Sequence, residues 1–405
     1  MKQLTKAALV ALWFMLLTFP LIGIKIDTVS KTFLWRWDRI ALMGVGIFVA
    51  ALLWQYCFQR KSRGLPIISL PESWNEGFSL FSTRPIVRRW VPLLVLLGLA
   101  TMPMFTSMYQ TNIMISALLY VMLALGLNIV VGLAGQLVLG YVAFYAVGAY
   151  TYGILYQHFG WGFWTCLPLG GLMSVLFGLA LGFPVLRLRG DYLAIVTLGF
   201  GEIIRISLQN WSSVTGGPNG ISSIARPSLF GMEMDIDAST IYIYYLVLLA
   251  VIITALLISR LKHSRVGLAL QALREDEIAS EAMGIDITKV KLSAFALSSC
   301  WAGFAGVIFA AKTTFINPAS FSFMESAMIL SMVVLGGMGS ITGVIIAALI
   351  LILVPEYLRA FSEYRMLLFG MVMVLMMIFR PQGLITGEKR QYRLPKSTKP
   401  QGDAQ

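Results

Sequence analysis

The sequence is poor in charged and in chemically reactive side chains. Of its 405 residues only 12% are charged, three are cysteine and two are histidine, and the dipeptide Gly-Lys does not occur. Without Gly-Lys there is no phosphate loop of the type G-x-x-x-x-G-K-[ST]. The cysteines have neither disulfide nor zinc spacing, and the histidines have no partner at metal-ligand spacing. We therefore expect no catalytic residue, no metal, no cofactor bound by this chain and no enzymatic activity of its own.

Long apolar stretches are what the chain has instead. Hydrophobic residues make up 58% of the sequence, and the mean hydropathy is +0.79. An apolar α-helix of about 20 residues crosses the ~30 Å hydrocarbon core of a bilayer. The composition therefore predicts an all-α, polytopic transmembrane helical bundle of about ten spans, with a range of roughly eight to twelve. The spans are expected at 7–24, 40–58, 91–108, 112–131, 137–157, 163–186, 192–208, 241–259, 291–311, 323–354 and 365–379.

Two of these stretches are unusual. Residues 192–208 are apolar but short, and residues 323–354 are too long for one span and are interrupted by the sequence GGMGSITG. A glycine-rich interruption at membrane depth is typical of two helices or half-helices that meet at a break. The two stretches together decide where the number of spans falls within the expected range.

The basic residues are distributed unevenly between alternate loops. With the N-terminus inside, the cytoplasmic segments carry 22 of the 31 Lys and Arg residues and the opposite segments carry 8. Cytoplasmic loops of membrane proteins have such an excess of Lys and Arg. The distribution therefore predicts that both termini are cytoplasmic. It also explains the net charge of +12 without a basic nucleic-acid-binding surface, so no nucleic-acid partner is expected.

Hydropathy and charge divide the chain into three parts. Residues 1–90 are predicted to form an N-terminal two-span hairpin and a basic cytoplasmic loop, 91–380 the core bundle, and 387–405 a basic, disordered cytoplasmic tail. The run 7–24 is interpreted as a retained span because it is long for a signal peptide and no small-x-small site precedes Lys25.

Small residues recur at every fourth position in three stretches. Such a row lies on one face of a helix and lets a second backbone approach closely within a membrane. The rows indicate either static helix packing or surfaces along which helices slide during a transport cycle. They consist of Gly170, Ser174, Gly178 and Gly182; of Ala302, Gly306 and Ala310; and of Gly339, Gly343 and Ala347.

A pair of opposite charges falls inside the apolar stretch 192–208. Each of Glu202 and Arg205 costs roughly 2.5–3.5 kcal/mol at the centre of a span. They are three positions apart, so they can face each other on a helix. Two interpretations remain open: a structural ion pair inside the bundle, or a role in the pathway or its gating. Asn112, Asn128 and Gln136 are further polar residues that either line a polar route or hydrogen-bond across helices.

One loop, residues 260–291, is rich in charge and in good helix formers. We expect a single helix from Val266 to Met283, with Gly284 as its stop and Asp286 as the cap of the next helix. Such a helix is either an ordinary solvated loop helix or one that inserts side chains into a groove of a soluble partner. The compact face would hold Ala272, Ala279, Ala282 and Met283, with Arg274, Glu275, Asp276, Glu277 and Glu281 around it.

Four stretches of the sequence resemble the permeases of branched-chain amino acid ABC importers. They are ALREDEIASEAMGID with the following KLSAFALSSCWAGFAGVIFA, GLNIVVGLAGQLVLGYVAFYAVGAYTYGIL, LRGDYLAIVTLGFGEIIRISLQNWSSVTGGPNGI and VVLGGMGSITGVIIAALI. Their order and spacing also fit, and together they cover roughly residues 110–380. The N-terminal hairpin is similar to the extension of one of the two permease types of the high-affinity importer.

The resemblance implies a bacterial inner-membrane subunit that moves leucine, isoleucine or valine. It implies a periplasmic binding protein that delivers the amino acid, a homologous second permease that completes a heterodimer, and two partner subunits that bind ATP. It also implies that residues 272–284 form the coupling helix that contacts the ATPase. The predicted coupling residues are Ala272, Arg274, Glu275, Asp276, Glu277, Ala279, Glu281, Ala282, Met283 and Gly284.

The coupling segment departs from the E-A-A-x-x-x-G signature that ABC importers more widely carry. Ile278, Ala279 and Ser280 stand where that signature has E-A-A before Gly284. The contact geometry of other importers is therefore not carried over, and no substrate-binding residue is either.

Two alternative functions remain. One is an importer of the same mechanism with another cargo, such as urea, an amide or another amino acid. The other is an ion-coupled secondary carrier, for which only Glu202 and Glu325 could serve as coupling acids.

Overall fold

The computed structural model describes residues 96–357 except 187, 189 and 228–234, together with residues 13, 15, 24–27, 32–35, 44, 48, 370, 374, 383 and 384. The chain divides into two compact units, Met1–Leu94 and Val95–Gln405. Most of the predicted spans 7–24, 40–58 and 365–379, and all of the tail 387–405, lie outside the described residues. The predicted division at residue 90 and the total number of spans stay predictions.

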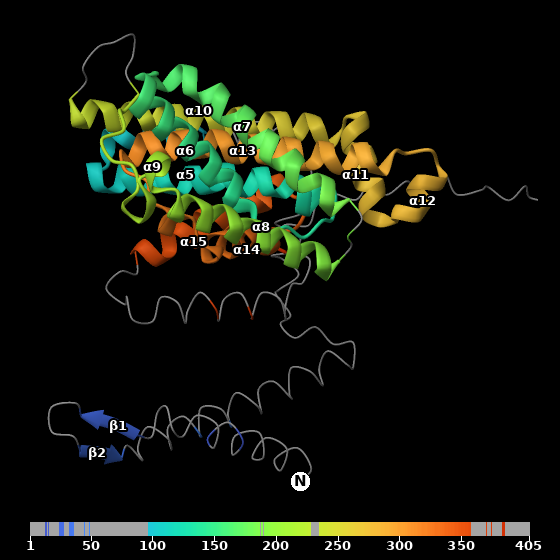
Figure 1. Cartoon of the computed structure of the whole chain (residues 1–405), viewed down its shortest axis with the longest axis horizontal. Coiled ribbons are helices and arrows are strands. Elements are labelled where there is room, and N and C mark those ends of the chain that lie inside the picture. The colour runs from blue at the N-terminus through green and yellow to red at the C-terminus, as the bar shows by residue number, and fades with distance from the viewer. Residues whose placement is uncertain are drawn as a thin grey trace, which may run out of the picture. The chain divides into compact units, whose positions relative to one another are not determined.

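In the first unit, the described residues include a two-stranded antiparallel ribbon. It consists of β1 (Ile24–Asp27) and β2 (Thr32–Trp35), with Ile24 opposite Trp35 (Figure 1). The ribbon falls in the segment between the first two predicted spans, where no strand was expected.

The second unit is a helical bundle, which confirms the predicted fold class. An unlabelled helix covers Leu96–Phe105, and four of the described helices are long and apolar enough to cross a membrane. The longer elements are α5 (Met108–Asn128), the π-helix η2 (Ile129–Leu133), α6 (Tyr141–Phe159), α7 (Phe163–Val185), α8 (Asp191–Asn210), α10 (Ile236–Lys262), α11 (Arg265–Glu275), α13 (Ile287–Thr313), α14 (Phe323–Gly336) and α15 (Ile341–Tyr357). The short ones are α9 (Ser212–Thr215), η3 (Gly217–Asn219), α12 (Glu277–Ala282) and η4 (Pro318–Phe321).

The stretch 323–354 forms two helices, as its glycine-rich interruption predicts. Helix α14 ends at Gly336 and α15 begins at Ile341. Between them Gly337 and Gly339 have φ values of +104° and +83°, which side chains other than glycine rarely adopt. The break therefore depends on its glycines.

Helices α6, α7 and α13 pack with their backbones almost in contact. A Cβ on Gly148 of α6 would overlap the carbonyl oxygen of Gly303 on α13, and one on Gly306 would overlap that of Tyr145. On α7, Gly170 abuts the side chain of Val307. The small-residue rows of α7 and α13 are thus packing surfaces. In the third row Gly339 lies in the turn before α15, because its positive φ is incompatible with a helix.

Helix α8 lies beside α14 on one side of the bundle and is much less enclosed (Figure 1). Only Leu193, Ala194 and Thr197 are buried along it. A Cβ on Gly199 would meet no heavy atom within 4 Å. Helix α8 does approach the bundle closely at one point, where a Cβ on Gly140 would overlap the carbonyl oxygen of Thr197.

Candidate functional site: the coupling segment and an intramembrane pocket

The charged loop forms two helices rather than the single one expected. Helix α11 ends at Glu275 and α12 begins at Glu277, because Asp276 has an extended backbone with φ −156° and ψ 119°. Its carboxylate accepts hydrogen bonds from the N–H groups of Ile278 and Ala279 at 2.9 and 3.0 Å. Asp competes with the helical backbone in this way and favours caps over helix interiors. The prediction of one continuous helix was wrong for that reason.

The charged loop's helical part ends at Gly284, as the sequence predicts. Gly284 has a φ of +82°, and the N–H of the following Ile285 bonds to the carbonyl of Ser280 at 3.1 Å. This is the geometry of a glycine-terminated helix. Asp286 then caps α13 by accepting from the N–H of Lys289 at 3.1 Å. That hydrogen bond and the contact with the Lys289 side chain lower the pKa of Asp286.

Arg274, at the end of α11, faces the bundle of its own chain. Its Nη1 donates to the carbonyl of Gly132 in the π-helix η2 at 2.6 Å. Lys262 reaches the neighbouring glycine turn, where Nζ donates to the carbonyl of Gly339 at 2.9 Å. The N–H of Gly339 in turn donates to Asn128 Oδ1 at 2.9 Å. These bonds join the charged segment, the end of α5 and the break between α14 and α15 into one polar junction.

A second connection runs from α12 to α13. Lys291 Nζ lies 2.5 Å from Glu277 Oε1, and only 4% of the Lys291 side chain is exposed. The same ammonium donates to the carbonyl of Leu186 after α7, at 3.4 Å. A buried ion pair that loses one partner leaves an uncompensated charge, which makes such a contact a firm attachment point. Lys291 was not singled out from the sequence, because its partner is known only from the fold.

The outer surface of α12 remains exposed and carries apolar side chains. Ile278 is 69% exposed and Met283 is 83% exposed. Besides Met283, the exposed residues of the predicted set are Arg274, Glu275, Asp276, Ala279, Glu281, Ala282 and Gly284, whereas Ala272 and Glu277 are half-buried. In Figure 1, α11 and α12 extend beyond one end of the helical bundle. The exposed residues therefore form a small surface that a partner protein can reach.

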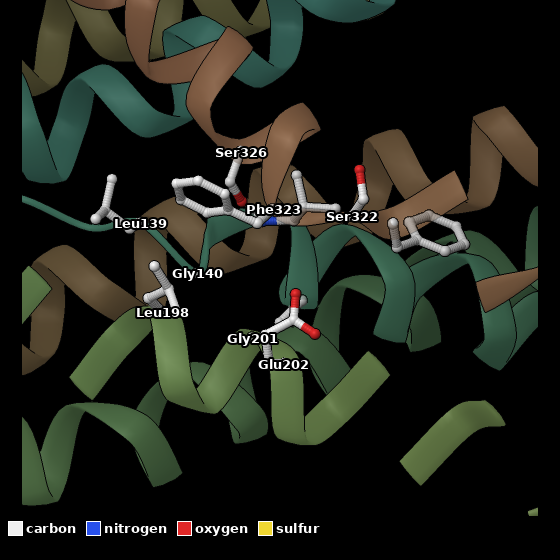
Figure 2. Close-up of a pocket in the computed structure, with 11 residues that line it drawn as sticks. Leu139, Gly140, Leu198, Gly201, Glu202, Ser322, Phe323 and Ser326 are labelled. Carbon is white, nitrogen blue, oxygen red and sulfur yellow. Dashed lines mark hydrogen bonds between the residues drawn. The ribbon is translucent and has the colours of Figure 1, made fainter. Parts of the chain in front are cut away.

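The predicted charge pair on α8 is formed. Arg205 Nε lies 2.8 Å from Glu202 Oε2, with 29% and 33% of the two side chains exposed. Glu202 also lines a small, partly open pocket between α6, α8 and α14. Figure 2 shows its carboxylate pointing from α8 across the pocket toward the start of α14, where Ser322 and Phe323 lie.

The other polar residues predicted within the bundle have different surroundings. Asn128 hydrogen-bonds across helices, whereas Asn112 donates to Met108 of its own helix at 3.1 Å. Gln136 is buried, and its Oε1 has no hydrogen-bond partner among the described residues. Glu325 accepts from the hydroxyl of Tyr120 at 2.6 Å. Among the described residues, no three His, Cys, Asp or Glu side chains come together in a group that could hold a metal.

The chain is similar to known transport proteins along most of its length. Residues 109–378 match the model of the family described as branched-chain amino acid transport system / permease component. The chain is 49% identical to the high-affinity branched-chain amino acid transport system permease protein LivM of Salmonella typhimurium, over 78% of this chain and 79% of that protein. It is 45% identical to the LivM of Escherichia coli K12, over 94% and 92%.

Similarity extends to a second kind of permease. The chain is 25% identical to the permease protein LivH of Salmonella typhimurium, over 66% of this chain and 91% of that protein. No solved structure matches the chain. LivM and LivH carry the name of the same high-affinity transport system, so relatives of this chain include two types of permease subunit.

Proposed function

The chain belongs to the family of branched-chain amino acid transport system permease components, and we propose that it is the LivM-type membrane-spanning subunit of an ATP-driven importer of leucine, isoleucine and valine. The observation that carries this proposal is the similarity, over nearly the whole chain, to permeases of that name. The membrane-length apolar helices agree with it. The chain's own role is transport rather than catalysis.

Three kinds of protein partner belong to this proposal. A LivH-type permease completes the pathway as the other half of a heterodimer, and the LivH relatives support this pairing. A periplasmic protein delivers the amino acid, and two ATPase subunits supply the energy, since this sequence has no phosphate loop. We place the complex in the bacterial inner membrane with both termini cytoplasmic, as the excess of Lys and Arg on that side favours.

Helix α12 is the proposed contact with the ATPase. Ile278 and Met283 are exposed apolar side chains of the kind that insert into a hydrophobic groove of a partner. When the ATPase closes and moves α12, the Glu277–Lys291 pair passes the motion to α13, and α11 passes it through Arg274 to η2. Both routes lead from the coupling segment into helices of the bundle.

Reconstitution tests the proposed function. Proteoliposomes are prepared with the chain alone and with the second permease, the ATPases and the binding protein, and leucine uptake is measured with enclosed ATP or with an ion gradient. We expect uptake only from the complete assembly with ATP, and competition by isoleucine and valine but not by urea. Uptake by the chain alone, driven by an ion gradient, would contradict the proposal.

A further inference from the structure

Helix α5 leaves one narrow face uncovered, and most of that face is polar. From Thr111 to the end of α5, all residues are buried except four, which are Asn112, Ile113, Ser116 and Tyr120. Residues three and four positions apart are neighbours on a helix surface, so these four lie on one side of α5. We call Asn112, Ser116 and Tyr120 the polar face of α5.

The polar face differs from the other uncovered surfaces of membrane-length helices. The large side chains that α7 and α10 expose most are apolar and suit contact with lipid; they include Leu172, Leu176 and Phe183 on α7 and Leu249 and Leu256 on α10. Helix α5 is also part of a candidate membrane span. Polar and ionisable side chains within a membrane almost always face the interior of the bundle or a water-filled cavity. The polar face of α5 therefore lies against water or protein rather than lipid.

A lysine of α13 contacts the polar face. Lys312 Nζ donates to Ser116 Oγ and to the carbonyl oxygen of Asn112, the latter at 3.3 Å. Lys312 belongs to the last turn of α13, where a lysine can extend its ammonium into the water outside a membrane, but its side chain reaches α5 instead. No carboxylate of the described residues pairs with Lys312. An ammonium has three N–H donors, so one remains for an anionic group.

A carboxylate of α14 contacts the same face one turn further along α5. Glu325, in the first turn of α14, accepts a hydrogen bond from the Tyr120 hydroxyl through Oε2 at 2.6 Å. Tyr120 follows Ser116 by four positions, which is about 6 Å along a helix. Within the part of the chain that the structure describes, Glu325 has no cationic partner. A carboxylate has about four acceptor sites, so Glu325 can also accept from an ammonium group.

The polar face lies in the half of the bundle that is further from the coupling segment. Helix α13 begins at Ile287, directly after that segment, and Lys312 is near its other end. The far end of α5 carries Asn128, which belongs to the polar junction with the charged segment. In the proposed orientation, an amino acid that arrives from the periplasm meets Lys312 before it reaches that junction.

We propose that the polar face of α5, together with Lys312 and Glu325, holds the amino acid during its passage along this chain. The α-carboxylate of the amino acid binds Lys312, and its α-ammonium binds Glu325. Such charge pairs attract more strongly beside apolar helices than in bulk water. The site is an open face along a passage and not an enclosed cavity. The inference rests on the proposed function and adds to it the residues that contact the cargo.

The first test removes the charge of Lys312 in the complete importer. Leucine uptake, ATP hydrolysis and the midpoint of thermal unfolding are measured on the same preparation. We expect Lys312→Gln to lower leucine imported per ATP hydrolysed about ten-fold, as the loss of a charge-assisted hydrogen bond requires, and Lys312→Arg to recover much of it. Lys289→Gln removes the same charge from the other end of α13, where the side chain is 84% exposed, and should leave the ratio unchanged.

The unfolding midpoint separates binding from a structural role of Lys312. The Gln amide can still donate to Ser116, so the midpoint should stay close to that of wild type. An unchanged ratio in Lys312→Gln would overturn the proposal. A fall in the ratio that is matched by a lower midpoint would show that Lys312 only holds α13 against α5, and it would overturn the proposal as well.

The second test removes the charge of Glu325 but keeps its contact within the bundle. The amide oxygen of Glu325→Gln can accept the hydrogen bond from Tyr120, as the carboxylate does. Only the attraction for an ammonium group is lost, and we expect the ratio of leucine to ATP to fall about ten-fold. A normal ratio would show that Glu325 is merely a structural partner of Tyr120.

Cysteine labelling tests whether water reaches the polar face. The three native cysteines are replaced by alanine, and an anionic, membrane-impermeant methanethiosulfonate is added from the periplasmic side. We expect Ser116→Cys to react, whereas Leu249→Cys on α10 should not, although Leu249 is 58% exposed in the isolated chain, because lipid excludes the reagent. If the two variants are equally unreactive while leucine uptake is normal, the site is overturned. A wild-type importer that takes up no leucine with ATP would instead contradict the proposed function.

Discussion

Two regions of the molecule are held in place by different kinds of contact. One consists of helices α6, α7 and α13, and the other is the coupling segment α11–α12. The three helices meet through glycines, so that Gly148, Gly303 and Gly306 bring backbones into direct contact. The coupling segment is attached by charged side chains, chiefly Arg274 and Lys291, and by the two buried leucines of α11. Close backbone packing allows little adjustment, whereas side-chain contacts leave the attached helices more room to shift. The difference agrees with the proposed role of the coupling segment as the element that receives motion.

The largest effect is expected from breaking the frame. A Leu side chain at Gly148 would overlap the backbone of Gly303, which cannot retreat without separating α6 from α13. Overpacking costs about 1–3 kcal/mol and occasionally more, so we expect Gly148→Leu to yield little folded importer. Gly199→Leu on the open face of α8 is the control and should be recovered normally. Gel filtration of the solubilised complex measures the recovery of both variants. Equal recovery would show that the close backbone contact between α6 and α13 is not needed for folding.

A smaller effect is expected from breaking the anchor of α12. Glu277→Gln leaves the Lys291 ammonium buried without its anion, which costs about 3–5 kcal/mol locally for a fully enclosed pair. We expect a lower midpoint of thermal unfolding in the solubilised importer. The double variant Glu277→Leu with Lys291→Met removes both charges and should recover much of the loss. If the single variant is as stable as wild type, Glu277 is not an anchor.

Features that depend on neighbouring residues were predictable from the sequence. The break between α14 and α15, the stop at Gly284, the cap at Asp286 and the Glu202–Arg205 pair all follow from residue types a few positions apart. The break at Asp276 was not predicted. The expectation of one helix rested on helix propensity summed over the whole segment, and such a sum gives little weight to one residue whose side chain favours a cap.

Contacts between distant residues could not be read from the sequence. Arg274 and Gly132 are 142 positions apart, and no local pattern states that a guanidinium will meet that carbonyl. The same holds for the pocket, which exists only because the starts of α6 and α14 meet the middle of α8. Glu202 stands out in the sequence because a charged residue is costly inside a membrane span. The residues that surround it are known only from the fold.

We propose that motion enters the bundle through the coupling segment, and the variant Arg274→Ala tests this proposal. Arg274→Ala removes the bond to Gly132, a charge-assisted bond worth about 1.5–3 kcal/mol, and leaves the exposed surface of α12 in place. The measurement is leucine imported per ATP hydrolysed by the complete importer in proteoliposomes. We predict that hydrolysis continues while the ratio falls about ten-fold, with partial recovery in Arg274→Lys. An unchanged ratio in Arg274→Ala would contradict the account.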